Sequence, residues 1–144
     1  MWAIDCGGLA MSVISKGRGY VYSLQYHVVW CVKYGHKVLN GDIETDLRYI
    51  LQRIADDNGF QIAELNIGLD HVHLLLDCKP QHYIPNMVKA LKGVSGRYLM
   101  QKYGDGLRNK LWGGHIWSPS YFIATVSENT ESQVREYIQN QERA

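Results

Sequence analysis

The first clear hydrophobic pattern lies between Tyr20 and Val32, where apolar and polar residues alternate. Apolar side chains occupy every second position of this stretch, whereas Gln25 and His27 share the opposite face. A period of two with many aromatic and β-branched residues is typical of a strand that packs one face against a core. We therefore predict one strand across the whole of this segment.

A helical period replaces the alternation further along the chain. Within residues 40–59 the apolar positions recur every three or four residues, which predicts a helix with Asp42 capping its start and Gly59 its end. A second helix is predicted over residues 85–103, because a proline at its first position suits the first turn. A last helix is predicted from about residue 130 to the C-terminus.

Three more strands are predicted, at residues 60–67, 71–78 and 116–126. The element order is then β-α-β-β-α-β-α, which is typical of an α+β, two-layer, ferredoxin-like (RRM-like) fold with an antiparallel sheet. A length of 144 residues suits one domain. We predict a single domain over residues 16–144 and a flexible N-terminal extension over residues 1–15.

The composition is that of a globular protein, with 46% hydrophobic and 20% charged residues. No apolar run approaches the ~18 residues that a membrane span needs, so no membrane association is expected. The three cysteines form no C-x-x-C pair, which favours reduced thiols and a cytoplasmic location.

Charge is distributed unevenly, although the net charge is only +1. Between Lys79 and Lys110 there are seven Lys or Arg residues and one acid, Asp105, whereas acids outnumber bases in the remainder. A basic stretch in an acidic chain is typical of a protein that contacts a polyanion with one surface. An ordinary solvated helix face would give the same pattern.

Three basic residues of the 85–103 helix share one face with two glycines. At 100° per residue this face carries Lys89, Lys92, Gly93, Gly96 and Arg97. The opposite face carries the apolar residues Met87, Leu91, Val94 and Tyr98. Glycines on a basic face would let a phosphate backbone come close, but they would also suit close helix packing.

The sharpest chemical signal is the run Asp70-His71-Val72-His73. Residues two apart on a strand point to the same side, about 7 Å apart, so the two imidazoles can converge on one divalent ion. A further oxygen ligand would favour Mg²⁺ or Mn²⁺. The pattern His-x-His also occurs by chance, and His27 is expected to be a packing or surface histidine.

The last predicted helix carries Tyr137 and Gln141, four residues apart and so on the same face. A tyrosine beside a metal-bound phosphate can act as a covalent nucleophile, and the amide oxygen of Gln141 is a possible metal ligand. The phenol must lose its proton during attack, and the sequence identifies no base for it. Helix packing would explain Tyr137 equally well, since the chain has ten tyrosines.

Five segments together resemble the transposases of the IS200/IS605 insertion sequences, which are single-domain HUH nucleases. The resemblance covers about residues 16–141, in order and with matching spacing. Its segments are residues 20–33, 70–76, 88–93, 111–119 and 137–141.

The resemblance implies that Tyr137 is the nucleophile and that His71, His73 and Gln141 hold the metal. It implies a homodimer that binds hairpins at the transposon ends as single-stranded DNA, with active sites that can be shared between the two chains. Cleavage would leave a 5′-phosphotyrosine and a free 3′-OH, and rejoining would need no nucleotide triphosphate. The candidate DNA contacts are Lys16, Arg18, Lys89, Lys92 and Arg97.

Three other interpretations stay open, one of which is a domesticated or inactive copy of such a transposase. A replication-initiator or relaxase nuclease would share the HUH chemistry, although such proteins usually carry extra domains. A non-catalytic nucleic-acid-binding module could use the same fold. It would need stacking aromatics in a strand motif that this sequence lacks, and it would have no use for His71 and His73.

Overall fold

The computed structural model describes residues 15–17, 20–22, 25–79, 83–107, 109–111, 114–126 and 130–143. The proposed N-terminal extension therefore lies outside the described residues up to residue 14, and so does Arg18. Lys16 lies in a short strand, and its side chain is not among those described.

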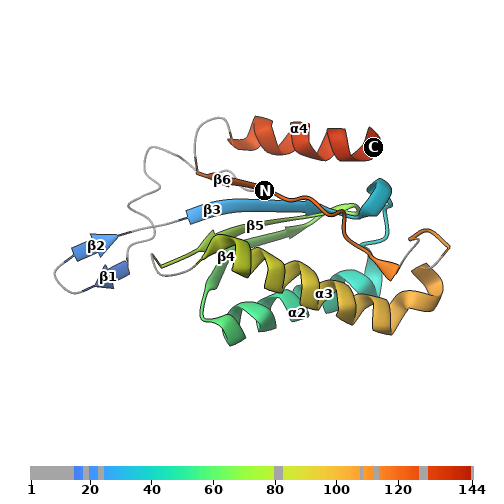
Figure 1. Cartoon of the computed structure of the whole chain (residues 1–144), viewed down its shortest axis with the longest axis horizontal. Coiled ribbons are helices and arrows are strands. Elements are labelled where there is room, and N and C mark those ends of the chain that lie inside the picture. The colour runs from blue at the N-terminus through green and yellow to red at the C-terminus, as the bar shows by residue number, and fades with distance from the viewer. Residues whose placement is uncertain are drawn as a thin grey trace.

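Four antiparallel strands form the central sheet, in the spatial order β4-β5-β3-β6 (Figure 1). Their bounds are Gln25–Cys31 for β3, Gln61–Ile67 for β4, His71–Asp77 for β5 and Phe122–Thr125 for β6. With α2 (Gly41–Asn58) after β3 and α3 (Ile84–Leu107) after β5, the order is β-α-β-β-α-β. The predicted α+β fold with an antiparallel ferredoxin-like sheet is confirmed.

The two faces of the sheet are covered differently. Helices α2 and α3 pack side by side on one face, whereas α4 (Thr130–Arg143) lies over the other, above β3 and β6 (Figure 1). The short 3-10 helix η1 (Lys33–Gly35), which follows β3, also contacts α4. No helix in the described ranges has the length and hydropathy of a membrane span.

The core lies between the sheet and α2 and α3. Trp30 of β3, Leu74 of β5, Leu51 of α2 and Leu91 of α3 are fully buried there. Burying an aliphatic side chain of this size contributes about 1.5–3 kcal/mol. This face therefore supplies much of the stability that holds the sheet in place.

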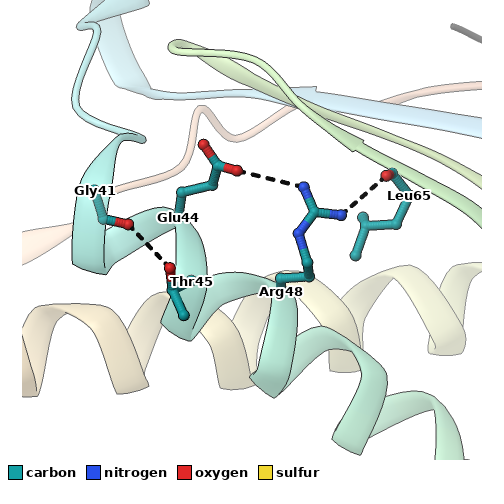
Figure 2. A network of polar contacts seen from close by, with 5 residues as sticks. All are labelled: Gly41, Glu44, Thr45, Arg48 and Leu65. Atoms are coloured by element: carbon teal, nitrogen blue, oxygen red, sulfur yellow. Dashed lines mark hydrogen bonds and ion pairs between the residues drawn. The ribbon is translucent and has the colours of Figure 1, made fainter.

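Polar contacts fix α2 against its neighbours. The guanidinium of Arg48 donates to the backbone oxygen of Leu65 in β4 at 3.2 Å and also pairs with Glu44 on its own helix (Figure 2). On the other side, Asp46 accepts a hydrogen bond from Tyr103 and pairs with Lys102 of α3 at 2.6 Å. One helix is thus bonded to both the sheet and the second helix.

The single strand predicted over residues 20–32 is wrong. Residues Tyr20–Tyr22 form β2, which pairs with β1 (Ser15–Gly17) in a separate two-stranded sheet. Gln25 is opposite Asp77, the last residue of β5, so the central sheet offers β3 no partner residue beyond that point. The alternation in the sequence continues although the pairing changes.

Other predicted bounds also need correction. Helix α3 continues to Leu107, which is buried, although the added turn contains Gly104 and Gly106 at a cost of roughly 1 kcal/mol each. Strand β6 is limited to Phe122–Thr125. Asp42 lies in the first turn of α2 and is not its cap, since Asn40 occupies that position.

The apolar face predicted for α3 is rotated from the observed one. Val94 is exposed, and Ser95 faces the core in its place. Ser95 can occupy a buried position because its hydroxyl donates to the backbone oxygen of Leu91 and accepts from the indole of Trp117 at 3.1 Å. A hydroxyl with both partners costs little to bury.

Candidate active site

The two histidines of the D-H-V-H run lie on the face of β5 that is turned away from the main core. Val72 and Leu74 point into that core, so His71 and His73 are on the side where α4 lies. His73 is buried, whereas His71 retains part of its surface. The predicted placement of both histidines on one face of a strand is confirmed, whereas their convergence on one metal ion stays a prediction.

The imidazole of His71 is oriented by its neighbours. Its Nδ1 lies 2.8 Å from a carboxylate oxygen of Asp70, which directs Nε2 away from that carboxylate. The ring also lies directly over Gly68, where a Cβ atom would come within 2.3 Å of it. A histidine whose one nitrogen is held by a carboxylate is the usual arrangement of a metal-ligating histidine.

His73 has a second histidine as its partner. His27 of β3 is also buried, and its Nδ1 lies 2.9 Å from Nε2 of His73. Burial lowers the pKa of His27 to about 4. Burial, together with the nearby His27 and His71, lowers the pKa of His73 to about 3. Both imidazoles are therefore neutral near pH 7, as metal ligation by His73 would require.

Helix α4 carries Tyr137 and Gln141 on one face, and both bond to one short segment. The Tyr137 hydroxyl lies 2.8 Å from Oγ of Ser120, and Ser118 donates from Oγ to Oε1 of Gln141 at 2.9 Å. We call residues 118–120 the serine segment. Burial raises the pKa of Tyr137, although the hydrogen bond with Ser120 acts in the opposite direction.

The serine segment connects α4 to the end of β3, next to the strand that carries the histidines. The backbone N–H of Ser118 donates to the carbonyl of Cys31 at 2.8 Å, and Cys31 is the register partner of His71. Tyr137 and Gln141 are thus attached at the end of β5 where His71 lies. Among the residues that the structure describes, no three His, Cys, Asp or Glu side chains form a metal-binding group. A metal ion at the histidine pair would need a further ligand of another type, such as the amide oxygen of Gln141.

A groove of about 450 Å³ lies between α3 and residues 114–119. Gly93 and Arg97 line it, and both Lys89 and Arg97 are exposed on this side of α3. The groove has the cations and the close backbone that a phosphate backbone needs. Whether Lys89 and Arg97 contact DNA stays a prediction.

Two other members of the predicted basic face have contacts of a different kind. Lys92 is half-buried, and its Nζ donates to the backbone oxygens of Ser118 at 2.7 Å and Ser120 at 2.9 Å. Burial lowers its pKa to about 8. Gly96 lies against Trp117, where a Cβ atom would be 3.1 Å from the indole. Close packing thus accounts for Gly96, and Gly93 alone of the two glycines lies open beside Arg97.

Comparison with known proteins assigns the family. A family model described as "Transposase IS200 like" matches residues 20–141. The ISDra2 transposase TnpA of Deinococcus radiodurans is 52% identical over 128 residues, which cover 89% of this chain and 91% of that protein. The transposase for insertion sequence element IS200 of Salmonella typhimurium is 28% identical, with 83% of this chain and 78% of that protein covered.

Solved structures agree with this assignment. A crystal structure of a Deinococcus radiodurans R1 protein, described as a transposase, superposes with a TM-score of 0.81 and 48% identity, covering 88% of this chain and 97% of that one. A REP-associated tyrosine transposase bound to a REP hairpin has the same fold, with a TM-score of 0.55, 14% identity, and 84% and 67% coverage. The fold is that of a transposase. The chain belongs to the IS200-like transposases of the IS200/IS605 type.

Sequence reasoning missed two groups of polar residues beside the predicted site. His27 is buried, in agreement with a packing histidine, but the sequence does not indicate that its partner is His73. Ser118 and Ser120 were not singled out, although two serines two residues apart in a segment predicted to be extended would face the same side. That spacing was the available signal.

Proposed function

We propose that this transposase binds hairpins at the ends of its element as single-stranded DNA and cuts and rejoins the strands through a 5′-phosphotyrosine on Tyr137. The observation that carries the proposal is the attachment of α4. It places Tyr137 and Gln141 one helical turn apart on the serine segment, which is bonded to the strand end opposite His71. A nucleophile and a metal-binding pair at one sheet end are the components that phosphodiester transfer needs.

Tyr137 would attack the phosphorus in line with the departing 3′-oxygen. The Tyr137 O–P bond forms as the P–O3′ bond breaks, and the leaving strand takes up a proton as a free 3′-OH. An incoming 3′-OH can reverse the step, because the phosphotyrosine retains the energy of the broken diester. Rejoining therefore needs no nucleotide triphosphate.

His71, His73 and Gln141 are the proposed ligands for Mg²⁺ or Mn²⁺. Asp70 holds His71 with Nε2 directed away from the carboxylate, and the lowered pKa of His73 keeps that imidazole neutral. The amide oxygen of Gln141 has a second lone pair beside its bond from Ser118. A divalent ion, when bound, would supply Lewis-acid stabilisation of the charge on the phosphate oxygens.

The DNA contacts are proposed for the basic side of α3, with the exposed Lys89 and with Arg97 at the groove, and for Lys16 and Arg18 near the N-terminus. The structural neighbour of the same fold is described as bound to a REP hairpin, which supports hairpin DNA as the ligand.

We also propose that the protein acts in the cytoplasm as a homodimer, in which active sites can combine residues of both chains. The family assignment favours a transposase over a replication initiator, a relaxase or a non-catalytic module.

The decisive experiment is to incubate the protein with single-stranded hairpin DNA and Mg²⁺ or Mn²⁺ and to look for a covalent protein–DNA adduct. We expect an adduct with the parent protein and none with Tyr137→Phe, which removes only the nucleophilic oxygen. Hairpin binding by Tyr137→Phe should stay close to that of the parent. An equal yield of adduct from Tyr137→Phe would transfer the nucleophilic role to another residue.

A further inference from the structure

The serine segment forms two hydrogen bonds with α4. Ser118 and Ser120 are two residues apart, and their hydroxyls meet Gln141 and Tyr137, which are four residues apart on one helix face. The chain bends at Pro119, between the two serines, and both hydroxyls bond to the same face of α4.

Lys92 holds the serine segment from the opposite side. Its ammonium group donates to the backbone oxygens of both Ser118 and Ser120, while the N–H of Ser118 donates to Cys31. Trp117, which precedes the segment, is buried and forms an isolated bridge with Val32. The backbone that carries the two hydroxyls is therefore fixed by α3 and by the end of β3 together.

Tyr137 has an aromatic contact as well as the hydroxyl contact. Its ring lies 5.9 Å from the ring of Phe122 in β6, between centroids. The ring is thus positioned by β6 and the oxygen by Ser120. A hydroxyl at 2.8 Å can donate to the phenolic oxygen at every stage, whether that oxygen carries its proton or not.

We propose that Ser120 is a catalytic residue of the transposition reaction, which donates a hydrogen bond to the Tyr137 oxygen as negative charge develops on it, and that Lys92 positions Ser120. The inference rests on the proposed role of Tyr137 as nucleophile. Ser120 keeps its own proton throughout, and the proton of Tyr137 leaves to solvent water. A hydrogen bond to a charged group is stronger than one to a neutral group, so the contact favours the attacking form over the resting form.

The test compares Ser120→Ala with Ser120→Thr, which retains a hydroxyl at the same position. Thr45→Ala is the matched control, because it removes an exposed hydroxyl that bonds within α2. At saturating hairpin DNA and with Mn²⁺, Ser120→Ala should form the covalent adduct about tenfold more slowly than the parent. Ser120→Thr should recover most of the rate, Thr45→Ala should match the parent, and hairpin affinity should be the same for all.

A second readout is independent of cleavage. In protein labelled with ¹³C at Cζ of tyrosine, the Tyr137 signal, assigned with Tyr137→Phe, should shift in Ser120→Ala and return towards its original position in Ser120→Thr. An unshifted signal, or cleavage by Ser120→Ala at the parent rate, would overturn the proposal for Ser120. If the parent itself forms no adduct while the signal shifts, the proposed function fails and the contact between the two hydroxyls stands.

Discussion

The two faces of the central sheet differ in what they bury. On β5, Val72, Leu74 and Leu76 enter the apolar core under α2 and α3, whereas His71 and His73 lie on the α4 side. The α4 side also holds the buried His27, bonded to His73. One strand thus supplies stability with alternate residues and chemistry with the others.

The helices that cover the two faces differ in the same way. Helix α3 buries apolar residues from Met87 to Leu107, with Ser95 among them, and α2 is bonded to both α3 and β4. Helix α4 buries Val134, and its Tyr137 and Gln141 are held by hydrogen bonds to the serine segment. Hydrogen bonds contribute about 1 kcal/mol each, less than a buried aliphatic side chain. The helix that carries the proposed nucleophile is therefore attached more weakly than the helices that hold the core.

The largest effect on activity should come from the face of the sheet that carries His71 and His73, which we call the histidine face. His71→Ala or His73→Ala should reduce metal-dependent cleavage by at least about a hundredfold, because too few ligands remain to hold a labile divalent ion. Gln141→Ala should reduce it less, about tenfold, since water can replace an amide oxygen in part. Calorimetry with Mn²⁺ measures the binding directly. If the double histidine variant bound Mn²⁺ as tightly as the parent, the proposed site would be wrong.

Substitutions on the opposite face of the sheet, which packs against α2 and α3, should change stability instead of activity. Leu74→Ala should lower the free energy of unfolding by about 2–5 kcal/mol, because Leu74 is fully buried between the sheet and the helices. Tyr137→Phe should cost only about 1 kcal/mol, the value of one hydrogen bond. Urea unfolding of the two variants measures both quantities. If Tyr137→Phe lowered the free energy of unfolding as much as Leu74→Ala does, α4 would contribute as much to stability as the core helices.

The same contrast explains what the sequence could predict. The alternation along β5 depends on neighbouring residues alone, so the placement of His71 and His73 on one face followed from local geometry. The break between β2 and β3 depends on where the partner strand ends, at Asp77, which the pattern of residues 20–32 does not contain. Periodicity predicts which face a residue occupies, but strand pairing decides how far an element extends.

The contacts of the candidate site were less predictable than its residues. The helical period placed Lys92 on the basic face of α3, but it could not indicate that the serine segment lies opposite and accepts both of its hydrogen bonds. The partners of His73 and Tyr137 likewise come from segments 46 and 17 residues away. Such contacts arise only when the chain is folded, so their discovery needs the structure.

Acid should destabilise the metal-free protein through the histidine face. Burial lowers the pKa of His27 from 6.5 to about 4 and that of His73 to about 3, so the unfolded chain takes up protons first as the pH falls. Above pH 6.5 the two histidines contribute their full stabilisation to the folded protein. Below pH 6.5 each of them should lower the free energy of unfolding by about 1.4 kcal/mol per pH unit, until the pH reaches its pKa in the folded protein. Unfolding measured from pH 7 to pH 4.5 tests this. His27→Gln should show a shallower decline, and an unchanged slope would contradict the assignment.

The smallest expected effects, on hairpin binding and on the cleavage rate, distinguish the basic residues of α3. Lys89 and Arg97 are both exposed, and Arg97 lines the groove. Replacing either with alanine should weaken hairpin binding a fewfold and reduce the salt slope by about one unit for each phosphate that no longer has a cation beside it. Lys92 is half-buried, and its ammonium group already donates to Ser118 and Ser120. Lys92→Met should therefore keep the parent salt slope and lower the cleavage rate of the saturated complex.

Titrations of hairpin DNA at several salt concentrations, followed by single-turnover cleavage, separate these outcomes. The triple change of Lys89, Lys92 and Arg97 to alanine should then combine both effects, with a reduced slope from the two exposed cations and a slower reaction from Lys92. If Lys92→Met reduced the salt slope as much as Lys89→Ala does, Lys92 would bind the DNA backbone in the complex. Its bonds to the serine segment would then have to open when DNA binds, and Lys92 could not position Ser120. If the triple variant kept the parent affinity and slope, the basic face of α3 would be an ordinary solvated surface and the hairpin would bind elsewhere.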